Sequence, residues 1–299
     1  MSRSSEARLF GVLGDPVDHS LSPAMHNAAF AAAHLPYLYL RFRVPPGGLA
    51  AAIREARRLR MGGLNLTVPL KEIALPLMDD LTREAARIGA VNTIVLRRGR
   101  LIGHNTDAAG FLAALGGRSL RGQHVVLVGA GGSARAVGVA LVDAGSARIT
   151  IANRTPRRAE TLAARLVGLG VREISIAPLE ALATGEFLAD ATLVVNTTPV
   201  GLFGDALRLR TAATPVDCRF VDLVYGSRPT PFLRAAARAH RETLDGARML
   251  LHQGALAFQA WTNRPAPLGA MARALTAAGL TLTQRGRAAS VPRRRPSIP

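Results

Sequence analysis

Cysteine and lysine are nearly missing from this sequence of 299 residues. The single cysteine, Cys218, excludes an intramolecular disulfide and a zinc site built from cysteine ligands. The single lysine, Lys71, is one of 38 basic residues, and all the others are arginines. No residues cluster at metal-ligand spacing, so we expect no metal site.

Acidic residues are also scarce, since 20 of them face 38 basic residues and leave a formal net charge of +18. Such a charge raises the question of nucleic-acid binding. The arginines are nevertheless spread over the whole chain, without a helix-turn-helix or RNA-binding signature, and only Arg285–Arg295 forms a cluster. We therefore expect no nucleic-acid partner and attribute the arginines mainly to a composition rich in Ala, Arg, Gly and Pro.

Long apolar runs are absent as well. The best candidate for a membrane span, residues 125–144, is interrupted by four glycines, Ser133 and Arg135. The apolar run near the N-terminus is too short for a signal peptide, so we expect a cytoplasmic protein. Hydrophobic residues still make up 48% of the sequence, which is enough for a core in two domains or one large domain.

Apolar runs and helical segments alternate along the chain, a pattern that predicts an α/β fold with parallel sheets covered by helices. In the first half we expect strands at Arg8–Leu13, Tyr37–Val44, Leu64–Val68, Val91–Leu96 and Leu101–Gly103, with helices at Ser22–His34 and Leu49–Leu59. In the second half we expect strands at Val125–Val128, Arg148–Ala152, Glu173–Ile176, Leu193–Asn196 and Phe220–Val224, and helices at Ser133–Ala144, Pro156–Leu169, Phe232–His240, Ala247–Trp261 and Pro267–Ala278. Ser22, Asp107 and Thr155 are the expected N-caps of their helices.

A glycine-rich loop follows the buried strand at Val125–Val128 and opens the next helix. It consists of Gly129, Ala130, Gly131, Gly132, Ser133 and Ala134, which fit the pattern G-x-G-x-x-A. The glycines allow a tight turn and a close approach of the backbone to a pyrophosphate, and the helix N-terminus offers N–H donors to it. In this strand–loop–helix context the pattern predicts a dinucleotide site.

The end of the second strand of this unit indicates which dinucleotide binds. An NAD-binding site would carry Asp or Glu about 20 residues after the glycine loop, to bind the ribose 2′-hydroxyl. This chain instead carries Asn153, Arg154 and Thr155, followed by Arg157 and Arg158. A guanidinium can bind a 2′-phosphate that a carboxylate would repel, so we expect NADP, with Arg154 and Arg158 as phosphate ligands.

Four clusters of small polar residues occupy strand ends and helix starts in the first half of the chain. They are His19–Pro23, Asn65–Lys71, Gly89–Thr93 and Asn105–Asp107. Some of these side chains would serve as helix caps, which is compatible with a second role in ligand binding. Because open α/β sheets bind ligands at the carboxyl ends of their strands, the clusters predict a site for a small polyhydroxylated substrate.

These clusters and the glycine loop together resemble the motifs of shikimate dehydrogenases. The matching segments run from residue 8 to about residue 260 in the order and spacing of that family. They are Gly14–Asn27, Gly63–Lys71, Gly89–Thr93, Asn105–Asp107, Gly129–Ala134, Asn153–Thr155, Asp222–Tyr225 with Thr230-Pro231, and Met249–Gln253.

The resemblance implies reversible reduction of 3-dehydroshikimate to shikimate with NADPH, a step of aromatic amino acid biosynthesis. It also implies an N-terminal α/β substrate domain and a Rossmann-type, doubly wound dinucleotide-binding domain, with the active site in the cleft between them. We accordingly expect the substrate domain at residues 1–105, completed by helices within 247–282, and the NADP-binding domain at 106–246. Residues 283–299 read as a disordered basic tail.

The family motifs also imply roles for single residues. Lys71 and Asp107 would form the catalytic pair, with Asp107 also contacting substrate. Ser20 and Ser22 would hold the substrate carboxylate, and the ring hydroxyls would be bound by Asn65, Thr67, Asn92, Tyr225 and Gln253. Leu223 and Gly246 would line the nicotinamide site.

The chemistry of the reaction favours a lysine at the centre of this site. Hydride transfer to a ketone builds negative charge on the carbonyl oxygen, which needs a proton or a fixed cation. A lysine ammonium can supply both, whereas an arginine retains its proton near neutral pH. The nearby histidines His19, His26 and His104 are expected to be buried and hydrogen-bonded, not catalytic. Arg248 departs from the glycine of many relatives and puts the nicotinamide side in question.

Three other functions are compatible with parts of this pattern. A quinate or aminoshikimate dehydrogenase would use the same chemistry on another ring, but Ser20 with Ser22, and Arg154, favour shikimate and NADP. A non-catalytic NADP(H)-binding regulatory protein would not need the pair Lys71 and Asp107. Nucleic-acid binding would rest on the arginines alone. We expect the protein to act on a small-molecule substrate as a monomer or homodimer.

Overall fold

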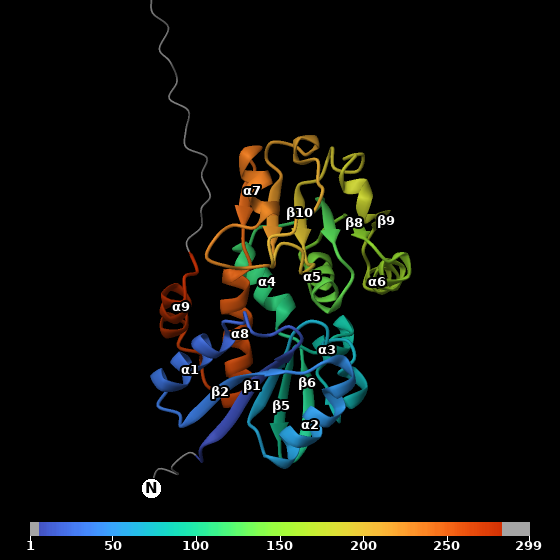
Figure 1. The fold of residues 1–299 in the computed structure, drawn as a ribbon. Helices are drawn as coiled ribbons and strands as arrows, with labels where there is room; N and C mark the ends of the chain where they lie inside the picture. Colours follow the sequence, from blue (N-terminus) through green and yellow to red (C-terminus); the bar gives the residue numbers. More distant parts are fainter. Residues whose placement is uncertain (1–5, 283–299) are drawn as a thin grey trace, which may run out of the picture.

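The computed structural model describes residues 6–282, and its two six-stranded sheets lie one below the other in Figure 1. The first sheet has the strand order β2-β1-β3-β5-β6-β4. Its strands are β1 (Arg8–Gly14), β2 (Tyr37–Arg43), β3 (Gly63–Leu66), β4 (Asp80–Leu81), β5 (Thr93–Arg97) and β6 (Arg100–His104). The basic tail at 283–299 falls outside the described residues.

The first sheet is mixed, so the expected parallel pairing holds for only part of it. β1 runs parallel to β2 and β3, but β5 is antiparallel to both β3 and β6. The physical reason lies in the connection between β5 and β6, which consists of Arg98 and Gly99, both with positive φ. A two-residue turn of this kind can join only antiparallel strands, because parallel strands need a long crossover.

The second sheet is parallel throughout, with the order β12-β11-β10-β7-β8-β9. Its strands are β7 (His124–Val128), β8 (Arg148–Asn153), β9 (Glu173–Pro178), β10 (Leu193–Asn196), β11 (Arg219–Asp222) and β12 (Glu242–Leu244). The short strand β12 was not expected from the sequence. The order reverses between β7 and β10, and such a switch point is where doubly wound sheets bind ligands. The predicted α/β class with a Rossmann-type sheet is confirmed.

Nine α-helices cover the two sheets within the described residues. They are α1 (Ser22–Ala32), α2 (Leu49–Arg58), α3 (Arg83–Ile88), α4 (Asp107–Leu115), α5 (Gly132–Asp143), α6 (Pro156–Gly168), α7 (Pro231–Arg238), α8 (Ala247–Thr262) and α9 (Leu268–Ala277). Short 3-10 turns lie at Pro46–Gly48, Leu75–Leu77, Leu179–Leu182 and Thr211–Ala213. No helix among residues 6–282 has the length and apolar character needed to cross a membrane.

Two of the three expected N-caps are wrong by one residue. Leu21 and Thr106 occupy the N-cap positions of α1 and α4, so that Ser22 and Asp107 are the first helical residues. In both helices a side chain two residues upstream accepts a hydrogen bond from the backbone N–H of that first residue: Ser20 Oγ for Ser22 at 3.3 Å, and Asn105 Oδ1 for Asp107 at 3.0 Å. This leaves the Ser22 and Asp107 side chains available to the cleft described below. Thr155 is the N-cap of α6, as expected.

The last two helices return to the first sheet. In Figure 1, α8 runs from the second sheet down beside α1, where it also contacts β5 of the first sheet, and α9 lies next to α1. Their apolar side chains join a core cluster with the first sheet that includes Phe10, Met25, Phe30, Phe258 and Met271. Residues near the C-terminal end of the chain are therefore held against strands from its beginning.

Candidate active site

A cleft opens between the two sheets, where the carboxyl ends of β1 and β3 face those of β10 and β11. Its lining includes every residue for which the sequence predicted a substrate or catalytic role, together with three of the predicted cofactor residues. They are Ser20, Ser22, Asn65, Thr67, Lys71, Asn92, Asp107, Tyr225 and Gln253, and Ser133, Leu223 and Gly246. Segments from both halves of the chain and from α8 thus form one concave site.

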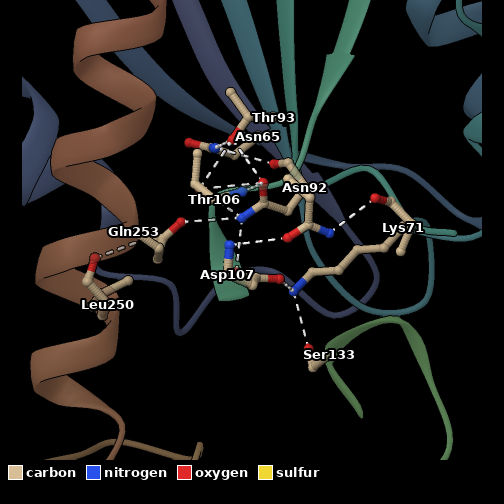
Figure 2. Close-up of polar contacts among 11 residues, drawn as sticks. Asn65, Lys71, Asn92, Thr93, Thr106, Asp107, Ser133, Leu250 and Gln253 are labelled. Carbon is tan, nitrogen blue, oxygen red and sulfur yellow. Dashed lines mark hydrogen bonds and ion pairs between the residues drawn. The ribbon is translucent and has the colours of Figure 1, made fainter. Parts of the chain in front are cut away.

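Lys71 lies at the junction of the two sides of this cleft (Figure 2). Its Nζ donates to Asp107 Oδ2 at 2.7 Å and to Ser133 Oγ at 3.0 Å. The side chains of Lys71 and Asp107 are 12% and 5% exposed, so water competes little for this ion pair. Because Ser133 belongs to the glycine loop and to the first turn of α5, the ammonium contacts the predicted cofactor loop as well as Asp107, its predicted catalytic partner.

Asn92 fixes the other oxygen of Asp107. Its Nδ2 donates to Asp107 Oδ1 at 2.8 Å and to Thr106 Oγ1 at 2.9 Å, while its Oδ1 accepts from the Thr106 backbone N–H at 2.8 Å. Gln253 Oε1 from α8 lies 3.5 Å from the same amide nitrogen. Figure 2 draws this contact as a dashed line. Asp107 is therefore held between an amide on one side and the Lys71 ammonium on the other.

Asn65 continues this network toward the first sheet. Its Nδ2 donates to the Asn92 carbonyl at 3.1 Å and to Thr93 Oγ1 at 3.0 Å, and its Oδ1 accepts from the Tyr39 hydroxyl at 2.6 Å. Tyr39 is fully buried, and burial raises the pKa of its hydroxyl well above the usual value. The hydroxyl therefore stays protonated and acts as a fixed donor to Asn65.

Ser20 and Ser22 lie at another part of the cleft, close to Tyr225. Both serines are buried, and Arg41 Nε donates to the Ser20 carbonyl at 2.8 Å. Burial raises the pKa of Tyr225, and the neighbouring Leu21 and Ser20 oppose that rise. The two serine hydroxyls and the protonated tyrosine hydroxyl form a group of neutral donors near an arginine, which suits a carboxylate or hydroxyl ligand.

Asp222 supports the loop that carries Tyr225. Its carboxylate accepts from Asn196 Nδ2 at 2.9 Å, from the Val224 backbone N–H at 3.0 Å and from Thr230 Oγ1 at 2.6 Å. Burial raises the pKa of Asp222 to about 6, against the opposing effect of these donors. The carboxyl thus ties the ends of β10 and β11 to the start of α7.

The glycine loop and the end of β8 are placed as expected for a dinucleotide site. Gly129 follows β7 with a φ of 109°, which L side chains rarely adopt, and α5 begins at Gly132. Ala130 and Ala134 are buried. At the end of β8, Asn153 Nδ2 donates to the Thr155 carbonyl at 2.8 Å. Arg154, Thr155 and Arg158 are exposed there, outside the cleft lining.

Comparison with known proteins decides the family. The model of the shikimate dehydrogenase substrate-binding domain matches residues 12–94, that of shikimate/quinate 5-dehydrogenase matches 112–199, and that of the shikimate 5′-dehydrogenase C-terminal domain matches 246–276. A shikimate dehydrogenase (NADP(+)) from Methanopyrus kandleri is 45% identical over 284 residues, which cover 92% of this chain and 97% of that protein. The chain belongs to the shikimate dehydrogenase family.

Solved structures of the shikimate dehydrogenase family have the same fold. A shikimate 5-dehydrogenase from Thermus thermophilus, in complex with NADP(H) and shikimate, matches with a TM-score of 0.77 and 43% identity, over 91% of this chain and 99% of that one. A quinate dehydrogenase from Corynebacterium glutamicum, in complex with NAD, matches with a TM-score of 0.80 and 32% identity, over 91% and 100% of the two chains. The predicted resemblance is confirmed at the level of the family.

In this shikimate dehydrogenase family member, several cleft residues were missed from the sequence: Val12, Thr197, Thr198, Pro199 and Leu202 in the lining, and Tyr39 behind it. Others lie inside the predicted motifs but had no role of their own assigned to them: Leu66, Val68, Val224, Met249 and Leu250 in the lining, and Thr93 and Thr106 behind it. Thr197, Thr198 and Pro199 directly follow β10, and small polar residues after a buried strand are the signal that identified the clusters of the first half. Tyr39 gave no such signal, because it lies within a strand.

Arg248 replaces a glycine of the family motif, which raised the question whether the predicted nicotinamide side of the cleft is altered. A side-chain carbon at Gly246 would lie 2.1 Å from the Leu223 carbonyl oxygen, so glycine is required there by a close backbone contact. Arg248 is half-buried and is not among the residues that line the cleft. The substitution therefore leaves the wall formed by Leu223 and Gly246 in place.

The three histidines near the motifs differ from expectation. His26 is buried, with a pKa lowered by burial to about 3, but neither ring nitrogen has a hydrogen-bond partner within residues 6–282, so the expected hydrogen bond is wrong. His19 is exposed and lies edge-on to Phe203, with ring centroids 6.4 Å apart, and His104 is half-buried. Among the described residues no group of three His, Cys, Asp or Glu side chains is arranged to hold a metal ion.

Proposed function

We propose that this chain catalyses the reversible NADPH-dependent reduction of 3-dehydroshikimate to shikimate, as an NADP-dependent oxidoreductase acting on a CH–OH group. One observation carries the proposal: the Lys71 ammonium lies 2.7 Å from Asp107 and 3.0 Å from Ser133. A single proton donor therefore contacts both the polar network predicted to bind substrate and the loop predicted to bind the cofactor. Hydride transfer to a ketone needs this arrangement, because the proton and the hydride must reach adjacent atoms.

The substrate would be held by groups that match its chemistry. Ser20 and Ser22 would bind the carboxylate, supported by the positive charge of Arg41 near the Ser20 carbonyl. The ring hydroxyls would be bound by Asn65, Thr67, Asn92, Asp107, Tyr225 and Gln253. Asn65, Asn92 and Asp107 are already held by hydrogen bonds within the protein, so these side chains lose little conformational entropy when substrate binds.

Lys71 and Asp107 would handle the proton. Lys71 Nζ donates a proton to the carbonyl oxygen as negative charge develops on it, and in the reverse direction the amine accepts the proton of the hydroxyl. Asp107 orients the ammonium through its 2.7 Å contact, and Asn92 in turn holds Asp107 at 2.8 Å. The low exposure of Lys71 strengthens these electrostatic interactions.

The described residues fit an NADP molecule. The pyrophosphate would be bound by backbone N–H groups of the glycine loop and the start of α5, which comprise Gly129, Ala130, Gly131, Gly132, Ser133 and Ala134. The adenosine 2′-phosphate would be bound at the end of β8 and the start of α6 by Asn153, Arg154, Thr155 and Arg158. Leu223 and Gly246 would face the nicotinamide. When bound, the reduced nicotinamide supplies the hydride.

The remaining assignments extend this proposal. The substrate domain would comprise residues 1–105 together with 247–282, and the NADP-binding domain 106–246; the membership of the two sheets and the packing of α8 and α9 against α1 support these bounds. We also propose that the protein acts in the cytoplasm as a monomer or homodimer, without a nucleic-acid partner.

Initial rates with four combinations of substrate and cofactor test the proposal: shikimate and quinate, each with NADP+ and with NAD+. We expect the highest kcat/KM with shikimate and NADP+, since Arg154 and Arg158 favour the 2′-phosphate. Activity with quinate and NAD+ alone would contradict it in favour of a quinate dehydrogenase. Binding of NADP+ without turnover of either substrate would instead favour a regulatory protein.

A further inference from the structure

The carboxylate of Glu72 joins the two sides of the cleft through two arginines. Glu72 Oε2 lies 2.8 Å from Arg135 Nη2, and Glu72 Oε1 lies 2.6 Å from Arg158 Nη2. Arg135 belongs to the first turn of α5 and Arg158 to the first turn of α6. Glu72 itself follows Lys71, in the segment after β3. One carboxylate from the first sheet's side therefore engages both helices that border the predicted phosphate sites.

This ion pair lies on the open face of the glycine loop. A side-chain carbon built on Gly131 would be 3.8 Å from Arg158 Nη2 and 3.9 Å from Glu72 Oε1, with no other atom within 4 Å. Gly131 is the N-cap of α5, where unpaired N–H groups and the helix dipole attract anions. The Glu72 carboxylate is thus an anion held next to the place where phosphates are expected to bind.

We propose that Glu72 competes with the phosphates of NADP for Arg158 and thereby lowers the affinity of the protein for this cofactor. The inference rests on the proposed function, because Arg158 is assigned to the 2′-phosphate there. A phosphate carries more negative charge than a carboxylate and binds a guanidinium through two parallel hydrogen bonds, so it displaces Glu72 from Arg158 when the cofactor binds.

Arg158 and Arg135 differ in exposure, so Arg158 can exchange Glu72 for a phosphate while the Glu72 carboxylate stays paired with Arg135. The Arg158 side chain is 54% exposed and can turn toward a ligand, whereas the Arg135 side chain is 14% exposed. Arg135 also lies 3.4 Å from the Gly89 carbonyl, which restrains its position. Glu72 therefore keeps its contact with Arg135 after it releases Arg158. The release involves the residue next to Lys71, so cofactor binding also acts on the segment that carries the proton donor.

Direct binding of NADP+ and NAD+ to the Glu72→Gln variant, measured by isothermal titration calorimetry at low salt, tests the proposal. We expect the Kd of NADP+ to fall about three- to tenfold, as the loss of a partly exposed competing charge predicts. The ratio of the Kd values of NAD+ and NADP+ should rise at least about threefold, because NAD+ lacks the 2′-phosphate that competes with Glu72 for Arg158. Glu72→Ala should change both values in the same direction.

Asp143→Asn provides a matched control. Asp143 on α5 forms an ion pair with Arg87 on α3, so this variant removes another charge pair between the same two sides of the cleft. Its NADP+ affinity should stay within about twofold of the parent protein. Weaker or unchanged NADP+ binding in both Glu72 variants, or an equal gain for NAD+, would overturn the proposal.

Measurements on the parent protein distinguish a failure of the Glu72 proposal from a failure of the proposed function. If it binds NADP+ and oxidises shikimate, while the Glu72 variants do not bind NADP+ more tightly, the competition alone is wrong. If the parent protein does not bind NADP+ or does not oxidise shikimate with it, the proposed function fails, whatever the variants do.

Discussion

The two sides of the cleft are organised in opposite ways. On the substrate side, Asn65, Asn92 and Asp107 are buried and joined by short hydrogen bonds, and each holds the next in place. On the cofactor side, Arg154 and Thr155 are exposed, and Arg158 is engaged by a carboxylate from across the cleft. Under the function proposed above, the substrate site would be preorganised by the protein, whereas the phosphate site would take its final arrangement with its ligand.

Replacement of Lys71, which contacts both sides of the cleft, should cause the largest loss of activity. Lys71→Ala should lower kcat by about 10³-fold or more with little change in the KM of shikimate, because the proton is transferred mainly in the transition state. Steady-state kinetics of shikimate oxidation measure this. Lys71→Arg keeps the positive charge but cannot release a proton and should lose nearly as much activity. Turnover close to that of the parent protein in Lys71→Ala would show that the contact with Ser133 is structural.

Asp222 tests whether the second sheet, like the substrate side, contains a buried hydrogen-bonded polar group that affects stability. The pKa of its carboxyl is about 6 in the folded protein, against an ordinary aspartate value of 3.8. Between these values the folded protein holds a proton that the unfolded chain has released, so the contribution of Asp222 to stability falls as pH rises. The loss amounts to as much as about 3 kcal/mol by pH 7.

Asp222→Asn should remove this pH dependence. The amide can keep the contacts with Val224 and Thr230, because a hydroxyl accepts as well as donates. Chemical unfolding of both proteins at several pH values from 4 to 7 gives the comparison. The difference in unfolding free energy should change steadily in favour of the variant as pH rises, and a constant difference would show that Asp222 titrates normally.

Asn92 tests the preorganised side directly. Asn92→Ala should lower kcat/KM for shikimate by about 10²-fold and the unfolding free energy by about 1–3 kcal/mol, because Asp107 and Thr106 lose buried hydrogen bonds. The matched change on the cofactor side is Asn153→Ala, which should stay within about 0.5 kcal/mol of the parent protein. Similar losses of stability in the two variants, measured by denaturant titration, would remove the contrast between the two sides.

Arg154 should give the smallest effect on the chemistry. Arg154→Ala should raise the KM of NADP+ about tenfold, with kcat and the KM of NAD+ little changed, since the proposed contact of its guanidinium is with the 2′-phosphate alone. Arg157→Ala is the control, because Arg157 is an exposed neighbour without an assigned ligand. An equal loss of NADP+ and NAD+ affinity in Arg154→Ala would move its contact from the 2′-phosphate to another part of the cofactor.

Much of the fold could be predicted from local patterns. The buried strands around Val125–Val128 and Leu193–Asn196 were placed closely because a strand covered on both faces is apolar throughout. The strands β5 and β6 were predicted, but their antiparallel pairing was not, since an apolar run reveals neither the neighbour of a strand nor its relative direction. β12 was missed because its three residues include Glu242 and show no apolar run.

The residues of the candidate site also divide into those that local sequence patterns predicted and those that they did not. Lys71 stood out in the sequence as the single lysine of a strongly basic chain, and the glycine loop was recognisable from the strand and helix around it. Gln253 was placed in the site through the family resemblance alone, and its contact with Asn92 spans 161 positions of sequence. Tyr39, Glu72 and Asp222 carried no local signal for the contacts they make.

The sequence by itself determined the class of fold, the family and the residue types that the reaction needs, because strand and helix periodicity, turn chemistry and short motifs are local properties of the chain. The tertiary structure alone decided which charges meet. It placed Lys71 between Asp107 and Ser133, and Glu72 between Arg135 and Arg158. Ion pairs and hydrogen bonds depend on distances of a few ångströms between segments far apart in the chain, and these distances are set by how the two sheets and α8 pack together.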